Sequence, residues 1–335
     1  MRNVHVVAVD LGGTNVRFAL VSPRGKVMRR RRLAMPGFRR PDDLYDWLAG
    51  AIEAFGKTCG ASARPRAVGV GFAGPADSAR GLVHYAPNVG GLVNLEIAAG
   101  LERRVGLPVI VENDANCAAL GEFWRGAGRG SASLFMFTVG TGIGGSFLIG
   151  GRVWRGADGL AGEIGHTVVA VGGPRCSCGK AGCLEALVSA TAIVREYSVA
   201  AGVGLSAGRP ITAKEVFDRA RRGDRRARRV VDGAARALGV GIANVFHLLN
   251  PEIILVGGGV SRAGRALMDP AREEARRMVF APLRDRLSVR RAMLGDDAGV
   301  VGAAFLALGG GAAGRSRPRA RSRLDGLTGD PGCVS

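Results

Sequence analysis

Three glycine clusters, each placed directly after a short apolar run, constrain the fold of this chain more than any other feature. The clusters and the runs before them are Gly12-Gly13 after Val4–Val9, Gly140–Gly145 after Ser133–Val139, and Gly257–Gly259 after Glu252–Val256. Short apolar runs that end in glycine are typical of buried strands followed by tight turns. Because glycine allows a close approach of the backbone, successive N–H groups in such turns can point at an anion.

The order of strands and helices occurs twice along the 335 residues. The elements expected before Asp114 are strands at Val4–Val9, Val16–Val21, Lys26–Arg32, Ala67–Phe72 and Pro108–Glu112, and helices from Pro41 to about Lys57 and after Asn94. The elements expected after it are helices at Ala115–Trp124, near Glu185–Ala200, at Ala213–Arg221, Ala227–Leu249 and Asp297–Leu308, and strands at Ser133–Val139, Ile143–Ile149 and Glu252–Val256. This repetition predicts a duplicated α/β architecture with a cleft between two halves.

The division into domains follows from the same repetition. We expect a small α/β domain over residues 1–113 that is completed by a closing helix at 298–310. A larger α/β domain would cover 114–297 and contain a cysteine-rich insertion. The tail, 311–335, alternates arginine with small residues and has little to bury, so it is expected to be disordered.

Basic charge is spread along the chain instead of being concentrated on one element. The formal net charge is +19, and nearly all of the basic residues are arginines, which run from Arg2 to Arg323. A nucleic-acid-binding surface usually gathers its charge on one element, so nucleic-acid binding is not expected to be the main function. The electric field of this net positive charge would still attract phosphates and nucleotides.

Neither a signal peptide nor a membrane span is expected. Asp10 ends the first apolar run, and the uncharged run Ser131–Gly151 is better explained by two strands joined by a Gly-Thr-Gly turn. A cytoplasmic location is therefore predicted. The cysteines agree, because in a reducing compartment three cysteines within Cys176–Cys183 favour a metal site over disulfides.

The second glycine cluster matches the G-x-G-x-x-G pattern of dinucleotide-binding proteins. In those proteins a helix follows the glycines and binds the pyrophosphate at its N-terminus. Here an apolar strand, Ser146–Ile149, follows instead. The pattern therefore favours a phosphate-binding hairpin and argues against a dehydrogenase.

The first cluster continues into Thr14, whose hydroxyl is a further donor, and begins with Asp10, which could hold magnesium through water. An Asp-Gly-Gly turn alone is also found in ordinary hairpins. Three such clusters together predict a nucleotide clamp for the phosphates and the nucleoside of ATP with Mg²⁺. The expected nucleotide-binding residues are Asp10, Gly12, Gly13, Thr14, Thr141, Gly142, Gly257, Gly258 and Gly259.

Cys176, Cys178, Cys183 and the upstream His166 supply three thiolates and one imidazole. This set completes the tetrahedral coordination of Zn²⁺ and leaves no open position, so the zinc would be structural. We expect the glycine turns that bind nucleotide to lie at a distance from this loop.

These motifs together resemble the ROK family of sugar kinases and repressors. The matching segments, in chain order, are Asp10–Arg17, Glu112–Asn116, Gly140–Gly145, Glu163–His166, Cys176–Glu185 and Gly257–Gly259. The likeness extends from about Val4 to Leu308 and is greatest to the bacterial glucokinases of that family. It implies an actin-like (ribonuclease H-like) ATPase fold with two domains and a hinged cleft, assembled as a homodimer or homotetramer.

Asp114 is the residue that the resemblance implies as general base. Its position before a helix is equally compatible with a helix cap. The implied substrate-binding residues are Asn88, Asn113, Asp114, Glu163, His166 and Glu185. Carboxylates and imidazole suit the hydroxyl groups of a hexose, although Glu163 could also be a solvated loop residue. His166 could bind metal through one ring nitrogen and face the sugar through the other.

The resulting hypothesis is ATP-dependent phosphorylation of a hexose, with glucose converted to glucose 6-phosphate. Many family members carry a tryptophan-containing segment after their Pro-Asn pair, whereas Asn88 is followed here by Val89–Leu92. Fructose or an N-acetylhexosamine is therefore an alternative substrate, and polyphosphate an alternative donor. A sugar-sensing repressor is less favoured, because only nine residues precede Asp10 and a helix-turn-helix needs more.

Overall fold

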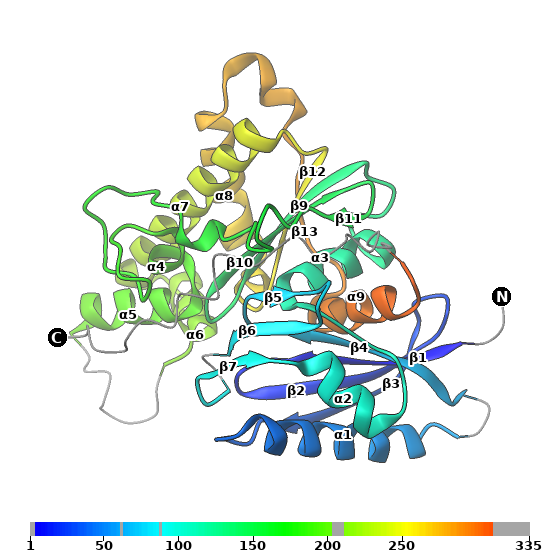
Figure 1. The fold of residues 1–335 in the computed structure, drawn as a ribbon. Coiled ribbons are helices and arrows are strands. Elements are labelled where there is room, and N and C mark those ends of the chain that lie inside the picture. Colours follow the sequence, from blue (N-terminus) through cyan, green and yellow to red (C-terminus); the bar gives the residue numbers. More distant parts are fainter. Residues whose placement is uncertain (1–3, 61–62, 87–88, 203–210, 311–335) are drawn as a thin grey trace.

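The computed structural model describes residues 4–60, 63–86, 89–202 and 211–310. In this part of the chain two five-stranded sheets lie one above the other, and a three-stranded sheet flanks the lower one (Figure 1). The tail at 311–335 and Asn88 lie outside the described residues. No helix within the described ranges is both long and apolar enough to cross a membrane.

The first sheet has the strand order β3-β2-β1-β4-β8. Its strands are β1 (His5–Leu11), β2 (Asn15–Val21), β3 (Val27–Ala34), β4 (Pro65–Phe72) and β8 (Val109–Asn113). Strands β1 to β3 form an antiparallel meander, whereas β4 and β8 continue the sheet in parallel with β1. The carboxyl ends of β1, β4 and β8 therefore meet at one edge, where residues carried by the following loops come together.

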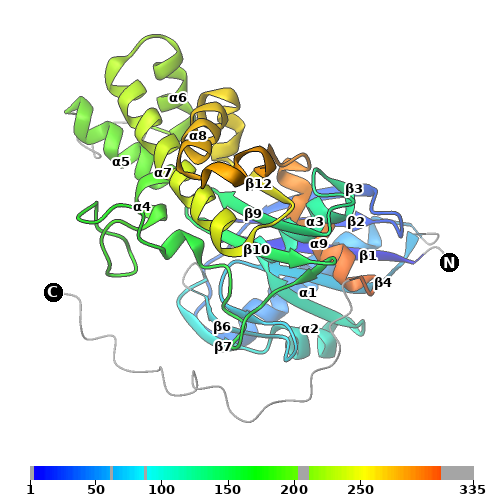
Figure 2. The same ribbon diagram turned by 90° about the horizontal axis from the view of Figure 1, so that it is seen from above.

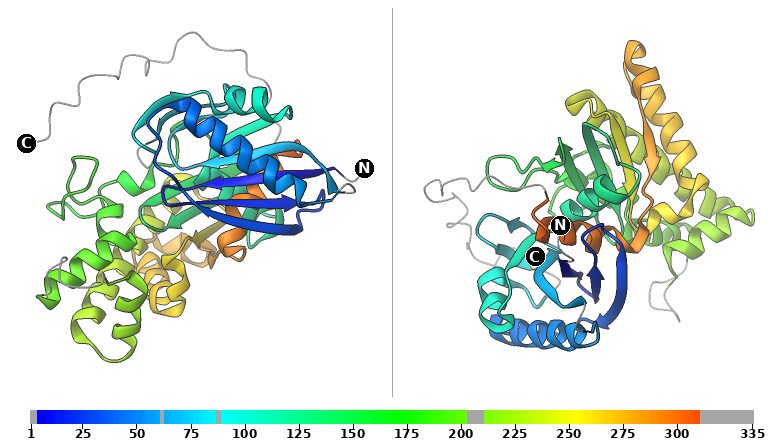
Figure 3. Two further views of the ribbon diagram at one scale, coloured as in Figure 1. Left: turned by 90° about the horizontal axis from the view of Figure 1, so that it is seen from below. Right: turned by 90° about the vertical axis from the view of Figure 1, so that its right-hand side faces the viewer.

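Two helices cover the outer face of this sheet, and Figure 3 shows α1 lying along it. They are α1 (Pro41–Lys57) and α2 (Ile97–Val105). The helix predicted from Pro41 to about Lys57 is confirmed, since Leu44, Leu48 and Ile52 of α1 face the core at helical spacing. The small antiparallel sheet consists of β5 (Ala76–Asp77), β6 (Leu82–Ala86) and β7 (Leu92–Leu95).

The second sheet repeats the topology of the first, with the order β11-β10-β9-β12-β13. Its strands are β9 (Ser133–Val139), β10 (Ile143–Ile149), β11 (Arg152–Val153), β12 (Ile253–Gly257) and β13 (Val289–Arg291). An antiparallel hairpin leads into parallel strands, as in the first sheet. The predicted duplicated α/β architecture and the strands Ser133–Val139 and Ile143–Ile149 are confirmed.

Five helices gather on the side of the second sheet that faces away from α3 (Figure 2). They are α4 (Leu184–Val188), α5 (Ala190–Ala201), α6 (Ala213–Arg221), α7 (Arg225–Leu249) and α8 (Arg265–Met278). The prediction of one helix near Glu185–Ala200 is wrong. Ser189 has an extended backbone and separates α4 from α5, and its hydroxyl accepts a hydrogen bond from the N–H of Ala192.

Helices α3 (Asp114–Arg125) and α9 (Ala298–Ala307) lie between the two sheets (Figure 1). They approach closely because each contributes a glycine to the contact. A side chain at Gly302 would collide with the carbonyl group of Cys117, and one at Gly121 with that of Ala298. Small residues in this layer allow both sheets to pack on the same helix pair, which brings the first residue of α3 between the two halves.

Candidate active site

Asp114 is the first residue of α3 and directly follows β8. Asn113 caps this helix, because its Oδ1 accepts hydrogen bonds from the backbone N–H groups of Ala115 and Asn116 at 2.9 and 3.2 Å. Asn113 also donates from Nδ2 to the carbonyl oxygen of Gly74 at 3.1 Å. Asp114 accepts a hydrogen bond from the N–H of Ala115 at 2.8 Å. The cap considered for Asp114 is thus supplied by Asn113.

The surroundings of Asp114 favour its protonated form. Withdrawal from water is the largest cause, the negative charge of Asp10 adds to it, and Glu163 contributes less, so the pKa of Asp114 rises to about 7. Asp114 is half-buried, and the loss of water around its carboxyl group outweighs the hydrogen bonds that lower its pKa. A carboxyl group that titrates near neutral pH is suited to accept a proton from a substrate.

The first glycine turn joins β1 to β2 and leaves Gly13 and Thr14 exposed. Two backbone hydrogen bonds hold it, from Gly12 to Asn15 at 3.1 Å and from Met35 to Thr14 at 2.9 Å. The adjoining carboxylate of Asp10 accepts a hydrogen bond from Arg17 at 3.0 Å. Burial raises the pKa of Asp10, and the Arg17 guanidinium opposes this rise.

The second glycine turn joins β9 to β10 and is held by residues near the cysteine loop. Gly140 accepts a hydrogen bond from the N–H of Ala190 at 2.8 Å, and Thr141 accepts one from the Thr191 hydroxyl at 3.0 Å. The N–H of Ile143 donates to Glu185 at 2.8 Å. The expectation that all the glycine turns lie at a distance from the cysteine loop is therefore wrong, because Glu185 follows Cys183 by two residues.

The third glycine cluster continues from the end of β12 and lies against the second. Gly258 has a φ of +82°, and a side chain there would strike the carbonyl oxygen of Val139, the residue before Gly140. Ser261 donates from its hydroxyl to the carbonyl oxygen of Gly258 at 2.7 Å and closes the turn. Gly258 and Gly259 are exposed, so their backbone groups are accessible to a ligand.

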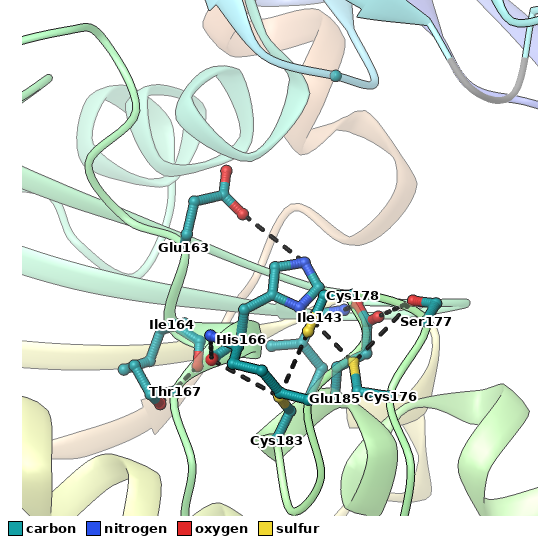
Figure 4. A network of polar contacts seen from close by, with 12 residues as sticks. Ile143, Glu163, Ile164, His166, Thr167, Cys176, Ser177, Cys178, Cys183 and Glu185 are labelled. Carbon is teal, nitrogen blue, oxygen red and sulfur yellow. Dashed lines mark hydrogen bonds and ion pairs between the residues drawn. The ribbon is translucent and has the colours of Figure 1, made fainter. Parts of the chain in front are cut away.

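The predicted metal ligands come together in one cluster, shown in Figure 4. The ligand atoms of His166, Cys176, Cys178 and Cys183 all lie within 4.8 Å of one another. Cys176 Sγ is 3.7 Å from His166 Nδ1, and Cys178 Sγ is 3.6 Å from Cys183 Sγ. A hydrogen bond from the backbone N–H of Lys180 lowers the pKa of the Cys178 thiol to about 7. This donor set fits a four-coordinate zinc ion.

The imidazole of His166 stands between the thiols and Glu163 (Figure 4). Its Nδ1 faces Cys176, and its Nε2 lies 4.0 Å from Glu163 Oε2. The two residues belong to the short 3-10 helix η2 (Ile164–His166) and the residue before it. One ring nitrogen is thus directed at the sulfur atoms and the other at the carboxylate of Glu163.

Five of the six predicted sugar-binding residues have described positions, and Asn88 does not. Asn113 and Asp114 stand at the junction of β8 and α3, Glu163 and His166 at η2, and Glu185 in the first turn of α4. The charge of Glu163 reaches Asp114, because it contributes to the raised pKa of that residue.

Sequence reasoning missed the polar residues that support this site. Glu112 is 1% exposed, accepts hydrogen bonds from Asn116 and Arg155, and directly precedes Asn113. Glu112 and Asn116 both lie in the segment Glu112–Asn116 that the sequence analysis singled out. The feature that could have indicated the supporting role of Glu112 is a carboxylate at the end of an apolar strand. Arg155 carries no signal of its own, because it is one arginine among many in an irregular loop.

Comparisons with known proteins identify the family of this chain. The chain matches the ROK family over residues 6–309. It is 38% identical over 315 residues to glucokinase of Thermotoga maritima, a match that covers 91% of this chain and 98% of the relative. It is 33% identical over 306 residues to N-acetylmannosamine kinase of Shigella flexneri, with coverage of 91% and 98%.

A solved structure gives the same result. The ROK family glucokinase from Streptomyces griseus, in complex with glucose and AMPPNP, superposes with a TM-score of 0.79 at 36% identity. The match covers 91% of this chain and all of that one. This chain therefore belongs to the ROK family.

Proposed function

We propose that this chain is a hexose kinase that transfers the terminal phosphoryl group of ATP to the 6-hydroxyl group of glucose. The observation that carries the proposal is the position of Asp114. It stands at the junction of β8 and α3, where the charges of Asp10 and of Glu163 both act on it. A base at that point is close to the turn suited to phosphate and to the residues suited to a sugar.

Asp114 acts as general base. Phosphoryl transfer requires the acceptor hydroxyl to be held in line with the phosphorus and to lose its proton. With a pKa of about 7, Asp114 is ionised in a large fraction of molecules at neutral pH and can accept that proton. The three glycine turns would hold the phosphates and the nucleoside of ATP, and Asp10 would hold its magnesium ion.

The hexose binds to polar groups from both halves of the chain. Asn113 and Asp114 approach it from the start of α3, and Glu163 and His166 approach it from η2. Glu185 has one carboxylate oxygen held by the N–H of Ile143, which restricts the orientation of the carboxylate that is proposed to meet a sugar hydroxyl. Asn88 is a further proposed contact.

The cysteine cluster holds one structural zinc ion. His166, Cys176, Cys178 and Cys183 are the proposed ligands, and their atoms already converge. When bound, zinc supplies a rigid anchor for the loop and no open coordination position. Its consequence for the reaction is indirect, because His166 then holds its second nitrogen toward Glu163.

The proposed domain division is residues 1–113 with 298–310, and 114–297. Helix α9 supports it, because the chain returns at Ala298 to pack against β1 and β4 of the first sheet. Closure of the halves around the substrates would then bring the glycine turns of the second sheet toward Asp10.

We place the protein in the cytoplasm, where ATP is available and cysteines stay reduced. Assembly as a homodimer or homotetramer stays a prediction.

A second candidate is phosphorylation of an N-acetylhexosamine, which the likeness to an N-acetylmannosamine kinase favours. An assay of the purified protein with ATP and a panel of glucose, fructose, N-acetylmannosamine and N-acetylglucosamine decides between them. Glucose should give the highest kcat/KM, and 6-deoxyglucose should bind without accepting phosphate. A higher kcat/KM for an N-acetylhexosamine, or a phosphorylated 6-deoxyglucose, would contradict the proposal. Replacing ATP by polyphosphate tests the donor.

A further inference from the structure

Glu112 is an almost completely buried carboxylate whose two oxygens are both occupied. Oε1 accepts hydrogen bonds from the backbone N–H of Asn113 at 3.0 Å and from Asn116 Nδ2 at 2.9 Å. Oε2 accepts two hydrogen bonds from Arg155, from Nε at 3.2 Å and from Nη2 at 2.5 Å. Glu112 is thus tied on one side to the helix start that presents Asp114, and on the other to Arg155.

Arg155 is the first residue of a closed loop that leads to η2. Its carbonyl oxygen accepts the N–H of Ala161 at 3.0 Å, which joins the two ends of the loop. Gly162 follows, and a side chain there would strike the carbonyl oxygen of Gly145 in β10, so the exit of the loop is also fixed. The next residue is Glu163. The hydrogen bond between Arg155 and Ala161 therefore couples the position of Arg155 to the residues that directly precede Glu163.

We propose that the ion pair between Arg155 and Glu112 is a positioning device for hexose binding. It holds the loop that carries Glu163 and His166 at a constant distance from Asn113 and Asp114. Glu112 belongs to the first sheet and Arg155 follows the edge of the second, so the pair joins the two sets of sugar-binding residues. This inference rests on the proposed function, since it assigns the role of the pair to the sugar site described above.

A simpler explanation is that Arg155 only neutralises the buried charge of Glu112. Removing one partner of a buried pair leaves the other uncompensated, which destabilises a fold wherever the pair lies. The geometry favours positioning, because two nitrogens of the planar guanidinium contact the same carboxylate oxygen, which restricts the orientation of Arg155 as well as its distance. An experiment must therefore remove the pair without leaving a buried charge.

The test uses the full chain and three variants, Arg155→Met, the double variant Glu112→Gln/Arg155→Met, and Arg152→Met as a matched control on an exposed arginine. Gln at 112 keeps an oxygen for Asn113 and Asn116 while removing the charge. Glucose and AMPPNP affinities are measured separately by calorimetry, zinc per chain by elemental analysis, and KM and kcat with ATP.

Positioning predicts that Arg155→Met and the double variant both lose glucose affinity by roughly tenfold or more, with nucleotide affinity and zinc content unchanged. The Arg152→Met control should behave as wild type. Glucose affinity restored in the double variant would overturn the inference, because it would show that Arg155 only compensates the charge. Unchanged glucose affinity in both, or an equal loss of nucleotide affinity, would overturn it as well.

The double variant also covers the case in which Arg155→Met does not fold, since it leaves no charge unpaired. The wild type separates this inference from the proposed function. If wild-type protein neither binds nor phosphorylates glucose, the proposed function is wrong, and the same variants are then measured with the hexose that the panel identifies.

Discussion

The carboxylate of Glu185 accepts a hydrogen bond from the backbone N–H of Ile143 at 2.8 Å. Its other oxygen is 3.5 Å from the Ser177 hydroxyl, inside the cysteine loop. One side chain thus contacts the loop proposed to hold zinc and the turn proposed to hold phosphate. A change in the cysteine loop should therefore alter the glycine turn, and the reverse, although the two segments are far apart in the sequence.

Loss of zinc should weaken the binding of both substrates, and of glucose more strongly. Cys178→Ser removes one thiolate with little change in size, so the loop loses its anchor and His166 its fixed orientation. We expect zinc content to fall together with glucose affinity, and AMPPNP affinity to fall by only a few-fold through Glu185, roughly the effect of one weakened hydrogen bond. Elemental analysis and calorimetry measure the three quantities.

Cys59→Ser is the control for this experiment, because Cys59 is a buried cysteine beyond the end of α1, and its thiol donates to a backbone carbonyl as a hydroxyl would. Near-stoichiometric zinc in Cys178→Ser would remove this residue from the ligand set. Lost zinc with unchanged glucose affinity would show that the metal holds the loop without orienting a sugar contact.

Asp114→Asn should abolish most of the activity while leaving nucleotide binding close to normal. Asn is similar in size but cannot accept the proton, so kcat should fall by roughly 10²–10⁴-fold. AMPPNP affinity should remain within about twofold of wild type, since general-base catalysis acts on the chemical step. Steady-state kinetics and calorimetry provide the measurements, with Asp232→Asn as an exposed control on α7. A variant that keeps more than about a tenth of the wild-type kcat would refute the assignment.

The activity of the wild type should depend on pH through Asp114. The base must be ionised, and its pKa is raised to about 7, so kcat/KM should fall as the pH drops through that value and level off above it. Asp10→Asn should move the midpoint to lower pH, because the negative charge of Asp10 is one cause of the raised pKa. A midpoint near the ordinary value of 3.8 would contradict the raised pKa.

The free energy of unfolding should depend on the same pKa. The ionised form of Asp114, which activity requires, is the form that disfavours the folded state. The pKa of Asp114 is 3.8 in its ordinary state and about 7 in the fold, so the folded protein binds the proton more tightly than the unfolded chain. The cost of ionising Asp114 is absent below pH 3.8, grows as the pH rises, and is complete above about 7. Asp114→Asn removes this cost and should raise the free energy of unfolding at pH 8 by roughly 1–3 kcal/mol.

Denaturant unfolding of both proteins at several pH values measures this difference. The stabilisation by Asp114→Asn relative to wild type should increase between pH 4 and pH 7, in the range set by the two pKa values. An equal difference at every pH would mean that the ionisation of Asp114 carries no cost in the fold.

Thr191 provides a test of the second glycine turn that leaves the metal ligands untouched. Its hydroxyl donates to the carbonyl oxygen of Thr141 at 3.0 Å, so Thr191→Val frees one end of the turn. The KM for ATP should rise roughly two- to tenfold, in line with the loss of one hydrogen bond, and the KM for glucose should change less. Thr58→Val is the matched control, because Thr58 makes a similar hydroxyl-to-carbonyl bond at the end of α1. An unchanged KM for ATP would argue against nucleotide binding at this turn.

Local sequence patterns were sufficient for the elements that depend on short-range regularity. The strands at Ser133–Val139 and Ile143–Ile149 and the helix at Ala213–Arg221 have the predicted bounds, because alternation, helical spacing and glycine turns are written in neighbouring residues. The cluster of His166 with the three cysteines was likewise predicted, since its cysteines are close in the chain. The order of the motifs was enough to identify the family.

Several helices and strands whose formation depends on residues distant in the chain were not predicted from the sequence. Helix α8 was missed because it contains Pro270, a residue that usually ends or kinks a helix, within its sequence. Strand β13 has only three residues and exists through its pairing with β12. The break at Ser189 was hidden because the residues on both sides favour helix.

At the site, the sequence determined which residue types are available, and the tertiary structure decided how they are used. Asn113 and Asp114 are neighbours and could each cap α3, and only the fold shows that Asn113 does so. The pKa of Asp114 depends on Asp10, which lies in β1, and on burial by the folded protein. The pairing of Glu112 with Arg155 joins residues 43 positions apart. Such relationships depend on distances across space, which the order of residues in one chain does not contain.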